Sequence, residues 1–248
     1  MMRLAHICRH PIKSIGFEEL ASASLTTGRA LSFDREWAVV HDAAKFDRLV
    51  AWAPKMNFLR GVAGPELMAI RAQVDEAARQ VTLTHPTAGQ ITVAPDSAGA
   101  ALLAWLRPLW PQDRPEPATV GCVPGQAMTD VPDGHIAVLN LASNADLGRR
   151  MGKDLSIHRW RGNLWLEGLA PWAEWELVGK RLRIGEAELL VQDRITRCKA
   201  TTVNPDTGKP DADTLGALSA AFGHEDFGTY AVVTRSGPIA RGDQIEVV

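Results

Sequence analysis

Short runs in which apolar and polar residues alternate occupy much of the first hundred residues. Val81 and Leu83 alternate with polar residues, and Ile91 and Val93 repeat the pattern after a turn-forming stretch. Because successive side chains on a strand point to opposite faces, this period of two indicates strands with one buried face. Further strands are expected at 37–40 and 68–74. The pattern predicts an antiparallel meander.

A different pattern follows at 96–110, where five apolar residues recur at spacings of three and four: Leu102, Leu103, Leu106, Leu109 and Trp110. This spacing predicts a helix with one apolar face, capped by Asp96 or Ser97. Three prolines in 111–117 predict a stiff connection. We therefore expect one domain over 1–95, a helix and connection over 96–117, and a second domain over 118–248.

The second half mixes short strands with two helices. Strands are expected at 135–139, 181–184, 188–191, 230–234 and 244–248, with a hairpin through Gly185. Ser143 to Asp146 has the form of a capping box that starts one helix. Asp211 or Asp213 caps the other helix, which ends at Gly223. The expected fold class is mainly β (α+β).

Composition excludes several classes of protein. The 248-residue chain is 46% apolar and carries a net charge of -2, which is typical of a globular domain and offers no general field for nucleic acid. No run approaches the length of a membrane span, and the N-terminus lacks a secretory signal. We therefore expect a cytoplasmic protein with no nucleic-acid or membrane partner.

The cysteine count limits any metal site. The chain has three widely spaced cysteines, Cys8, Cys122 and Cys198. This number argues against a disulfide framework and excludes a four-cysteine zinc site or iron–sulfur cluster in this chain. A bound metal would therefore take few ligands from the protein.

Cys198 has the most informative surroundings. It lies between Arg197 and Lys199, and Thr201 and Thr202 follow it before a turn-forming stretch at 204–208. Cationic neighbours favour the thiolate, which is both a nucleophile and a soft metal ligand. The alternative is a buried, unreactive cysteine on a strand. Local chemistry alone does not decide between the two.

Four other segments carry candidate site residues. Lys13 and Ser14 form a pair suited to a phosphate, and Arg35 directly precedes an apolar strand. Two arginines and Asn163 precede another apolar run, and Asp130 offers a carboxylate in a loop. Taken singly, each segment has a plain alternative, an ordinary turn or a solvated charge, and for Lys13 and Ser14 the turn is the better interpretation.

Taken together and in order, these segments resemble the MOSC proteins, and among them the two-domain branch that includes the mitochondrial amidoxime-reducing component and its bacterial relatives. The segments that carry the resemblance are 10–14, 34–37, 161–163, 175–179 and 196–208, with Gly162 in place of a proline of the family pattern. The resemblance spans nearly the whole chain. It implies two barrel-like antiparallel β domains with several peripheral helices, and a cofactor in the cleft between them.

The resemblance also implies roles for individual residues. Cys198 would ligate the molybdenum of a molybdenum–pterin cofactor, whose dithiolene supplies further sulfur ligands. Asp130 would lie near the metal as a second catalytic residue. The cofactor-binding residues would be Lys13, Ser14 and Arg35 at the phosphate, and Arg161, Asn163, Thr196 and Arg197 at the phosphate or pterin.

The implied function is a molybdenum-dependent reductase that removes oxygen from an N-hydroxylated or S-oxide small molecule in a two-electron reaction. Because the chain carries no ferredoxin domain, electrons would come from a separate donor protein. Two alternatives stay open: a carrier of the cofactor or its sulfur without turnover, and a fold that binds another phosphorylated ligand. Segment 49–54 is less polar here than in the family, which predicts a less polar pocket wall.

Overall fold

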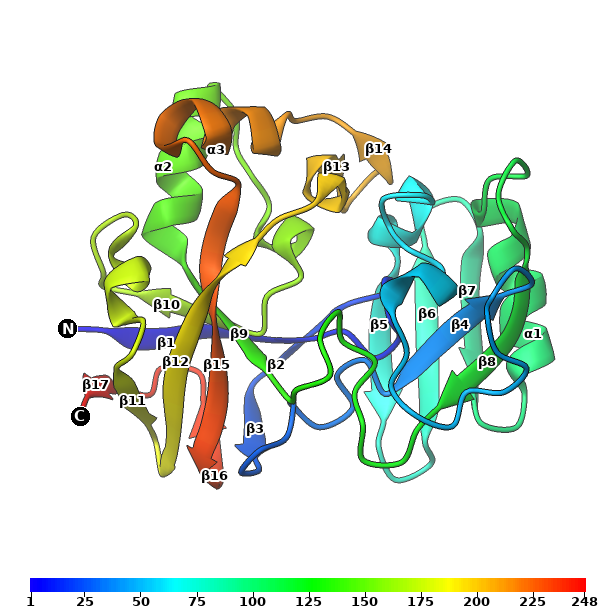
Figure 1. Ribbon diagram of the computed structural model, residues 1–248, viewed down its shortest axis with the longest axis horizontal. Coiled ribbons are helices and arrows are strands. Elements are labelled where there is room, and N and C mark those ends of the chain that lie inside the picture. Colours follow the sequence, from blue (N-terminus) through cyan, green and yellow to red (C-terminus); the bar gives the residue numbers. More distant parts are fainter.

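The computed structural model describes residues 1–248 and consists mainly of strands arranged in two lobes (Figure 1). The larger lobe is built on an eight-stranded sheet that contains one parallel pair, β10 with β9. In spatial order, the strands of this sheet are β17 (Ile245–Val247), β11 (Arg181–Ile184), β12 (Ala187–Thr196), β15 (Asp226–Arg235), β9 (Ile136–Asn140), β10 (Leu164–Glu167), β1 (Arg3–Arg9) and β2 (Glu18–Leu20).

The large sheet is curved, and backbone hydrogen bonds link the two ends of the chain across it. Leu4 donates its N–H to the carbonyl of Asp243 at 2.9 Å, and Ile245 donates to Met2 at 2.9 Å. These bonds bring β1 beside the segment that leads into β17, although no continuous ladder closes the sheet. The apolar core of this lobe lies against the sheet and includes the fully buried residues Leu4, Ile7 and Val138. The fold is mainly β, as the sequence predicted.

The smaller lobe contains a meander of β5 (Arg71–Asp75), β6 (Gln80–His85) and β7 (Gly89–Val93), together with a pair formed by β4 (Trp37–His41) and β8 (Pro117–Cys122). Val81 and Leu83 are fully buried, which confirms the face predicted from the alternation. Helix α1 (Gly99–Leu106) continues into a 3-10 turn, η3 (Arg107–Leu109), and packs beside β8.

The remaining short elements are divided between the two lobes. The helices are α2 (Leu141–Met151) and α3 (Thr214–Phe222), and the 3-10 turns are η1 (Lys55–Asn57), η2 (Pro65–Ala69), η4 (Ile157–Trp160), η5 (Ala173–Leu177) and η6 (Lys199–Thr202). The hairpin of β13 (Val203–Asn204) and β14 (Lys209–Pro210) extends toward the smaller lobe (Figure 1). No helix of this fold has the length and apolar character that crossing a membrane would require.

Two predicted helix starts are wrong. Helix α1 begins after Ala98 without a side-chain cap, because the carboxylate of Asp96 instead accepts hydrogen bonds from Trp37 at 2.8 Å and Arg79 at 2.7 Å. Helix α2 begins before the predicted box, and the side chain of Asn140 caps it. The predicted cap at Asp213 and the end at Gly223 are confirmed.

Strand pairing crosses the boundaries expected from the sequence. Strands β1 and β2 lie in the sheet of the C-terminal half, and β3 (Ser22–Leu25) pairs with β16 (Gly237–Ala240). Conversely, β8 pairs with β4 of the smaller lobe. Periodicity identifies strands but does not identify their partners, so this exchange was not visible in the sequence. The crossing strands bring loops from both halves of the chain to the space between the lobes.

Candidate functional site

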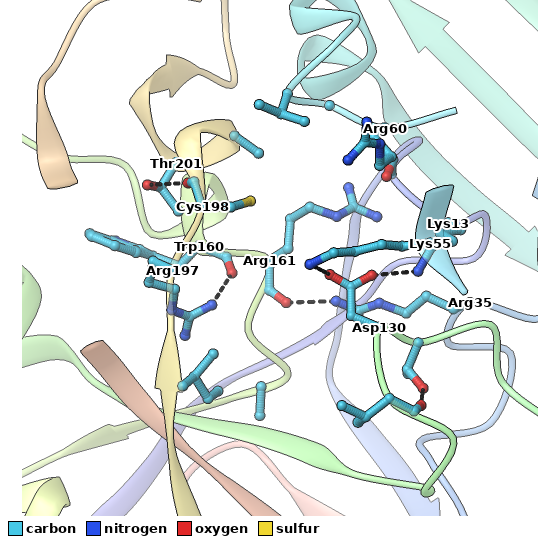
Figure 2. A pocket seen from close by; sticks show the side chains of 18 of the residues that line it. Lys13, Arg35, Lys55, Arg60, Asp130, Trp160, Arg161, Arg197, Cys198 and Thr201 are labelled. Carbon is cyan, nitrogen blue, oxygen red and sulfur yellow. Dashed lines mark hydrogen bonds and ion pairs between the residues drawn. The ribbon is translucent and has the colours of Figure 1, made fainter. Parts of the chain in front are cut away.

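A cleft between the two lobes is lined by residues from both halves of the chain (Figure 2). Every residue predicted as part of a site lies in its wall: Lys13, Ser14, Arg35, Asp130, Arg161, Asn163, Thr196, Arg197 and Cys198. These positions are up to 185 residues apart in sequence, from Lys13 to Cys198. The fold therefore gathers the predicted segments into one place.

Cys198 directly follows the long strand β12 and precedes the turn η6. Its side chain is exposed, and Figure 2 shows the sulfur pointing into the cleft. Cys8, in contrast, is 1% exposed, and burial raises the pKa of its thiol well above the usual range. The buried, unreactive arrangement considered for Cys198 is therefore found at Cys8, while Cys198 presents a free thiol to the cleft.

The cleft has a strong excess of positive charge. Its lining contains one carboxylate, Asp130, against seven basic side chains: Lys13, Arg35, Lys55, Arg60, Arg159, Arg161 and Arg197. Burial lowers the pKa of Arg161 to about 9 and that of Arg197 to about 10. Buried cations with little compensating charge are costly, and a bound anion would offset that cost. The wall is therefore suited to an anionic ligand.

Three residues of the wall have a left-handed backbone conformation that is uncommon outside glycine. The φ angles are 64° at Ser14, 51° at Arg35 and 50° at Arg161. Such conformations cost on the order of 1–3 kcal/mol each and cluster at functional sites. Their concentration in one cleft is independent support for a binding function.

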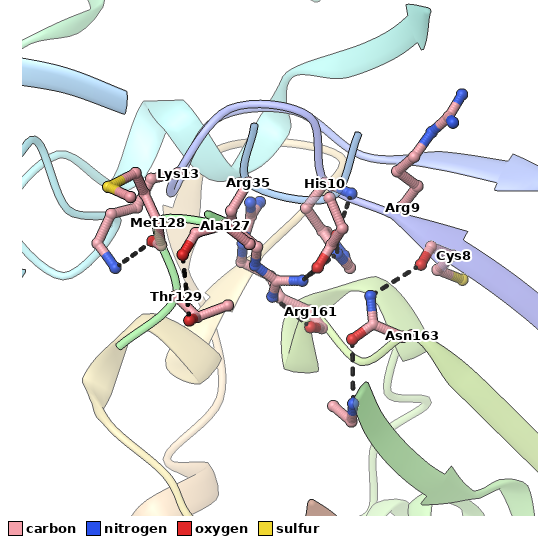
Figure 3. Close-up of polar contacts among 12 residues, drawn as sticks. Cys8, Arg9, His10, Lys13, Arg35, Ala127, Met128, Thr129, Arg161 and Asn163 are labelled. Atoms are coloured by element: carbon pink, nitrogen blue, oxygen red, sulfur yellow. Dashed lines mark hydrogen bonds and ion pairs between the residues drawn. The ribbon is translucent and has the colours of Figure 1, made fainter. Parts of the chain in front are cut away.

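Arg35 and Arg161 hold each other's loops in place across the cleft (Figures 2 and 3). Arg35 donates from Nη2 to the carbonyl of Arg161 at 2.9 Å. Arg161 in turn donates to the carbonyls of Gly16 at 3.0 Å and Ile12 at 3.3 Å. Much of the hydrogen-bonding capacity of these two arginines is thus used to fix the wall, and their charges remain directed at the cleft.

Asp34 supports this arrangement from behind the wall. Its side chain is buried and accepts hydrogen bonds from the backbone N–H of His10 at 2.8 Å and from the guanidinium of Arg35. Burial acts to raise the pKa of this carboxyl, but the charge of Arg35 and hydrogen bonds with the side chains of His10 and Arg35 hold it well below its usual range. Asp34 therefore stays ionised and anchors Arg35.

Lys13 and Asp130 form an ion pair in the lining of the cleft. The ammonium of Lys13 donates to Asp130 Oδ1 at 2.6 Å and to the carbonyl of Met128 at 2.9 Å, and Lys55 lies 3.7 Å from Asp130 Oδ2. Burial lowers the pKa of Lys13. For Asp130, partial burial acts to raise the pKa, but Lys13 outweighs it and lowers the pKa. The carboxylate is thus an acceptor at neutral pH and a poor proton donor.

Asn163 and Thr196 line the cleft, but their side chains are bonded to the protein. Asn163 donates to the carbonyl of Cys8 at 3.2 Å and accepts from the N–H of Ala137 at 3.0 Å, joining β1 to β9 (Figure 3). Thr196 donates to Asp226 at 2.7 Å. The geometry therefore favours a role in shaping the wall for these two residues.

Sequence reasoning missed several lining residues and misjudged one segment. None of residues 49–54 lines the cleft, so the expectation of a less polar wall there is wrong. Trp52 instead supports the wall, donating to the carbonyl of Thr129 at 3.1 Å. The residues that follow contribute Lys55 and Arg60, which are cationic. Lys55 lies in the short turn η1 and Arg60 in a loop, and isolated basic residues at such positions form no sequence pattern that could have identified them.

The fold and this site define a two-lobed β protein with a cationic cleft that exposes one thiol. The MOSC domain family matches residues 126–246, and the MOSC N-terminal beta barrel domain family matches residues 1–104. The chain belongs to the MOSC-domain proteins, with an N-terminal MOSC barrel domain.

Among curated proteins, the chain is 33% identical over 122 residues to human mitochondrial amidoxime-reducing component 1. This alignment covers 44% of this chain and 35% of that protein. It is 31% identical over 118 residues to the molybdenum cofactor sulfurase of Caenorhabditis briggsae, covering 47% of this chain and 16% of that protein. The chain thus spans only about a third of the length of the first relative and less of the second. Among solved structures, the YuaD protein of Bacillus subtilis aligns over 100% of this chain and 96% of its own at 13% identity, with a TM-score of 0.48.

Proposed function

We propose that this chain binds a molybdenum–pterin cofactor in the cleft between its lobes, with Cys198 as the protein's ligand to the metal. The observation that carries the proposal is the exposed thiol of Cys198 facing a cationic wall (Figure 2). A thiolate is a soft ligand suited to molybdenum, and the excess of cations suits a phosphate. The relative from Caenorhabditis briggsae is named for the same cofactor, as a molybdenum cofactor sulfurase, which supports the proposal.

The groups of the cleft fit such a cofactor. The Nη2 atom of Arg197 is buried and has no hydrogen-bond partner within the protein, so it offers a donor to an anion or a pterin. The hydroxyl of Ser14 lies in the same wall. In this proposal Lys13, Arg35 and Arg161 supply charge, while Asn163 and Thr196 keep the wall in shape.

We further propose that the protein reduces N-hydroxylated or S-oxide small molecules. When bound, the cofactor supplies two-electron oxygen transfer. For an N-hydroxylated substrate the N–O bond breaks, an N–H bond forms, and the oxygen leaves as water. Two electrons come from a separate donor protein and two protons from solvent. Asp130, held ionised by Lys13, accepts a hydrogen bond from substrate or water and so orients it.

The decisive test is the molybdenum and pterin content of protein purified from a molybdate-supplied host. We expect wild type to carry both, and Cys198→Ala to lose most of the metal. Cys122→Ala is the matched control, because Cys122 lies outside the cleft and should leave loading unchanged. Absence of metal from wild type, or full loading of Cys198→Ala, would count against the proposal.

Turnover is tested separately on loaded protein, with a chemical reductant and N-hydroxylated and S-oxide compounds. Reduction of either class supports the enzymatic role. Full loading without reduction of any compound would favour a cofactor carrier.

A further inference from the structure

The wall opposite Cys198 contains a second cationic element, which the proposed cofactor-binding set does not include. Figure 2 shows Arg60 and Lys55 entering the cleft from the smaller lobe, on the side facing Cys198. Neither residue belongs to the segments that resemble the family pattern. These two cations are therefore candidates for binding a ligand other than the cofactor.

The guanidinium of Arg60 has no partner within the protein. No carboxylate lies within 4.0 Å of it, and its side chain makes no hydrogen bond, unlike the arginines at 35, 161 and 197. A guanidinium presents several N–H donors in a planar fork that matches a carboxylate or phosphate. Arg60 is therefore available to an anionic ligand.

The loop that carries Arg60 is held in a fixed position. The preceding residue, Leu59, is fully buried and donates its N–H to the carbonyl of Val39 in β4 at 2.9 Å. The carbonyl of Arg60 accepts hydrogen bonds from Ala63 and Gly64, each at 2.9 Å. The backbone of this loop is thus fixed, so the cost of ordering it on binding is small.

The same loop approaches the segment that carries Cys198. A Cβ atom placed on Gly61 would lie 3.6 Å from the Cβ of Ala200, two residues after the cysteine. Val62, next in the loop, also lines the cleft and is 38% exposed. The wall that faces the thiol therefore combines a free guanidinium with an apolar surface.

Resting on the proposed function, we propose that Arg60, assisted by Lys55, is the specificity-determining subsite for substrates that carry an acidic group on an apolar body. The acidic group pairs with Arg60, the apolar body packs on Val62, and the reducible oxygen is directed toward Cys198. The other cations of the cleft disfavour a positively charged substrate.

The test compares two ligands that differ by a single carboxylate. The substrates are benzohydroxamic acid and its 4-carboxy derivative, and the corresponding amide products allow binding to be measured by calorimetry without turnover. On loaded wild type, we expect kcat/KM and amide affinity to favour the carboxylated compound by about ten-fold or more, the size of one charge-assisted hydrogen bond.

Arg60→Gln should remove this preference and leave molybdenum and pterin content unchanged. Arg60→Lys should retain part of the preference, and Lys55→Gln should narrow it. Arg107→Gln is the matched control, since this arginine is 62% exposed and lies outside the cleft. Equal binding of the two amides by wild type, or an undiminished preference in Arg60→Gln, would overturn the proposal.

Loss of cofactor from Arg60→Gln would also overturn it, because Arg60 would then serve the cofactor phosphate. Failure of the proposed function alone would give a different result. If wild type carries no molybdenum but still binds the carboxylated amide more tightly, through Arg60, the anion subsite stands and the proposed function fails.

Discussion

The two walls of the cleft hold their functional side chains by different means. In the larger lobe, Cys198 follows β12, a ten-residue strand that pairs with the ten-residue strand β15. In the smaller lobe, cations such as Lys13, Arg35 and Arg60 stand on loops between short elements. A ladder of backbone hydrogen bonds holds the strand that leads to Cys198, and we call this side the strand wall. The other side, the loop wall, depends on the left-handed residues Ser14 and Arg35 and on the buried pair of Asp34 with Arg35.

The two walls should therefore respond differently to substitution. Removing one side chain from the strand wall leaves the ladder in place, so the loss is local. Removing a supporting group from the loop wall leaves a buried charge without compensation, and such charges are expensive.

Asp34→Asn should have the largest effect on folding. An amide cannot balance the charge of Arg35, so the free energy of unfolding should fall by about 3–5 kcal/mol, as for other broken buried ion pairs. Chemical denaturation measures the change. Asp206→Asn is the control, because Asp206 forms an exposed pair with Arg71 that should contribute only about 0–1 kcal/mol. Equal effects of the two variants would refute the role given to Asp34.

The difference in stability between wild type and Asp34→Asn should depend on pH in a defined direction. The folded-state pKa of Asp34 lies below its value in the unfolded chain, so its contribution is fully present above the unfolded pKa of about 3.9. It is lost as pH falls through the lower folded pKa. The gap between wild type and Asp34→Asn should therefore be constant near neutrality and should shrink only in acid.

Asn163→Ala tests whether this residue shapes the wall or binds the cofactor. The substitution leaves the buried N–H of Ala137 without its acceptor, which should lower the free energy of unfolding by about 1–3 kcal/mol. Folded protein should nevertheless retain most of its molybdenum. Unchanged stability combined with lost metal would make Asn163 a direct cofactor ligand.

Glu174→Gln probes the support behind the strand wall and should have the smallest effect. Glu174 is fully buried, burial raises the pKa of its carboxyl, and its Oε1 has no partner. Wild-type stability should therefore decrease as pH rises above the unfolded pKa of about 4.3. Replacing it by the neutral amide should stabilise the protein on the order of 1 kcal/mol at pH 8 and have little effect near pH 4. Denaturation at both pH values checks this, and a loss of stability at pH 8 would contradict it.

The sequence predicted features that depend on neighbouring residues. Alternation at Val81 and Leu83 identified a buried face, and Gly185 marked the hairpin between β11 and β12. The site residues were recognised because a motif around Cys198 occurred together with ordered companions. Patterns of this kind are local, and the structure brings their members to one cleft.

What the sequence missed depends on tertiary contacts. Hydrophobic periodicity does not reveal that β1 pairs in the sheet of the larger lobe or that β8 pairs with β4 in the smaller lobe. Asp96 has the chemistry of a helix cap, but Trp37 and Arg79 compete for its carboxylate. Arg60 belongs to no motif, and only the packing of its loop near Ala200 places it in the site.

If Cys198 ligates the metal, the strand wall contributes one sulfur to it. X-ray absorption at the molybdenum edge of purified wild type measures this directly by counting sulfur ligands. We predict one thiolate sulfur in addition to the dithiolene pair, and its loss from metal-loaded Cys198→Ser. A sulfur count that is the same in both proteins would contradict the account.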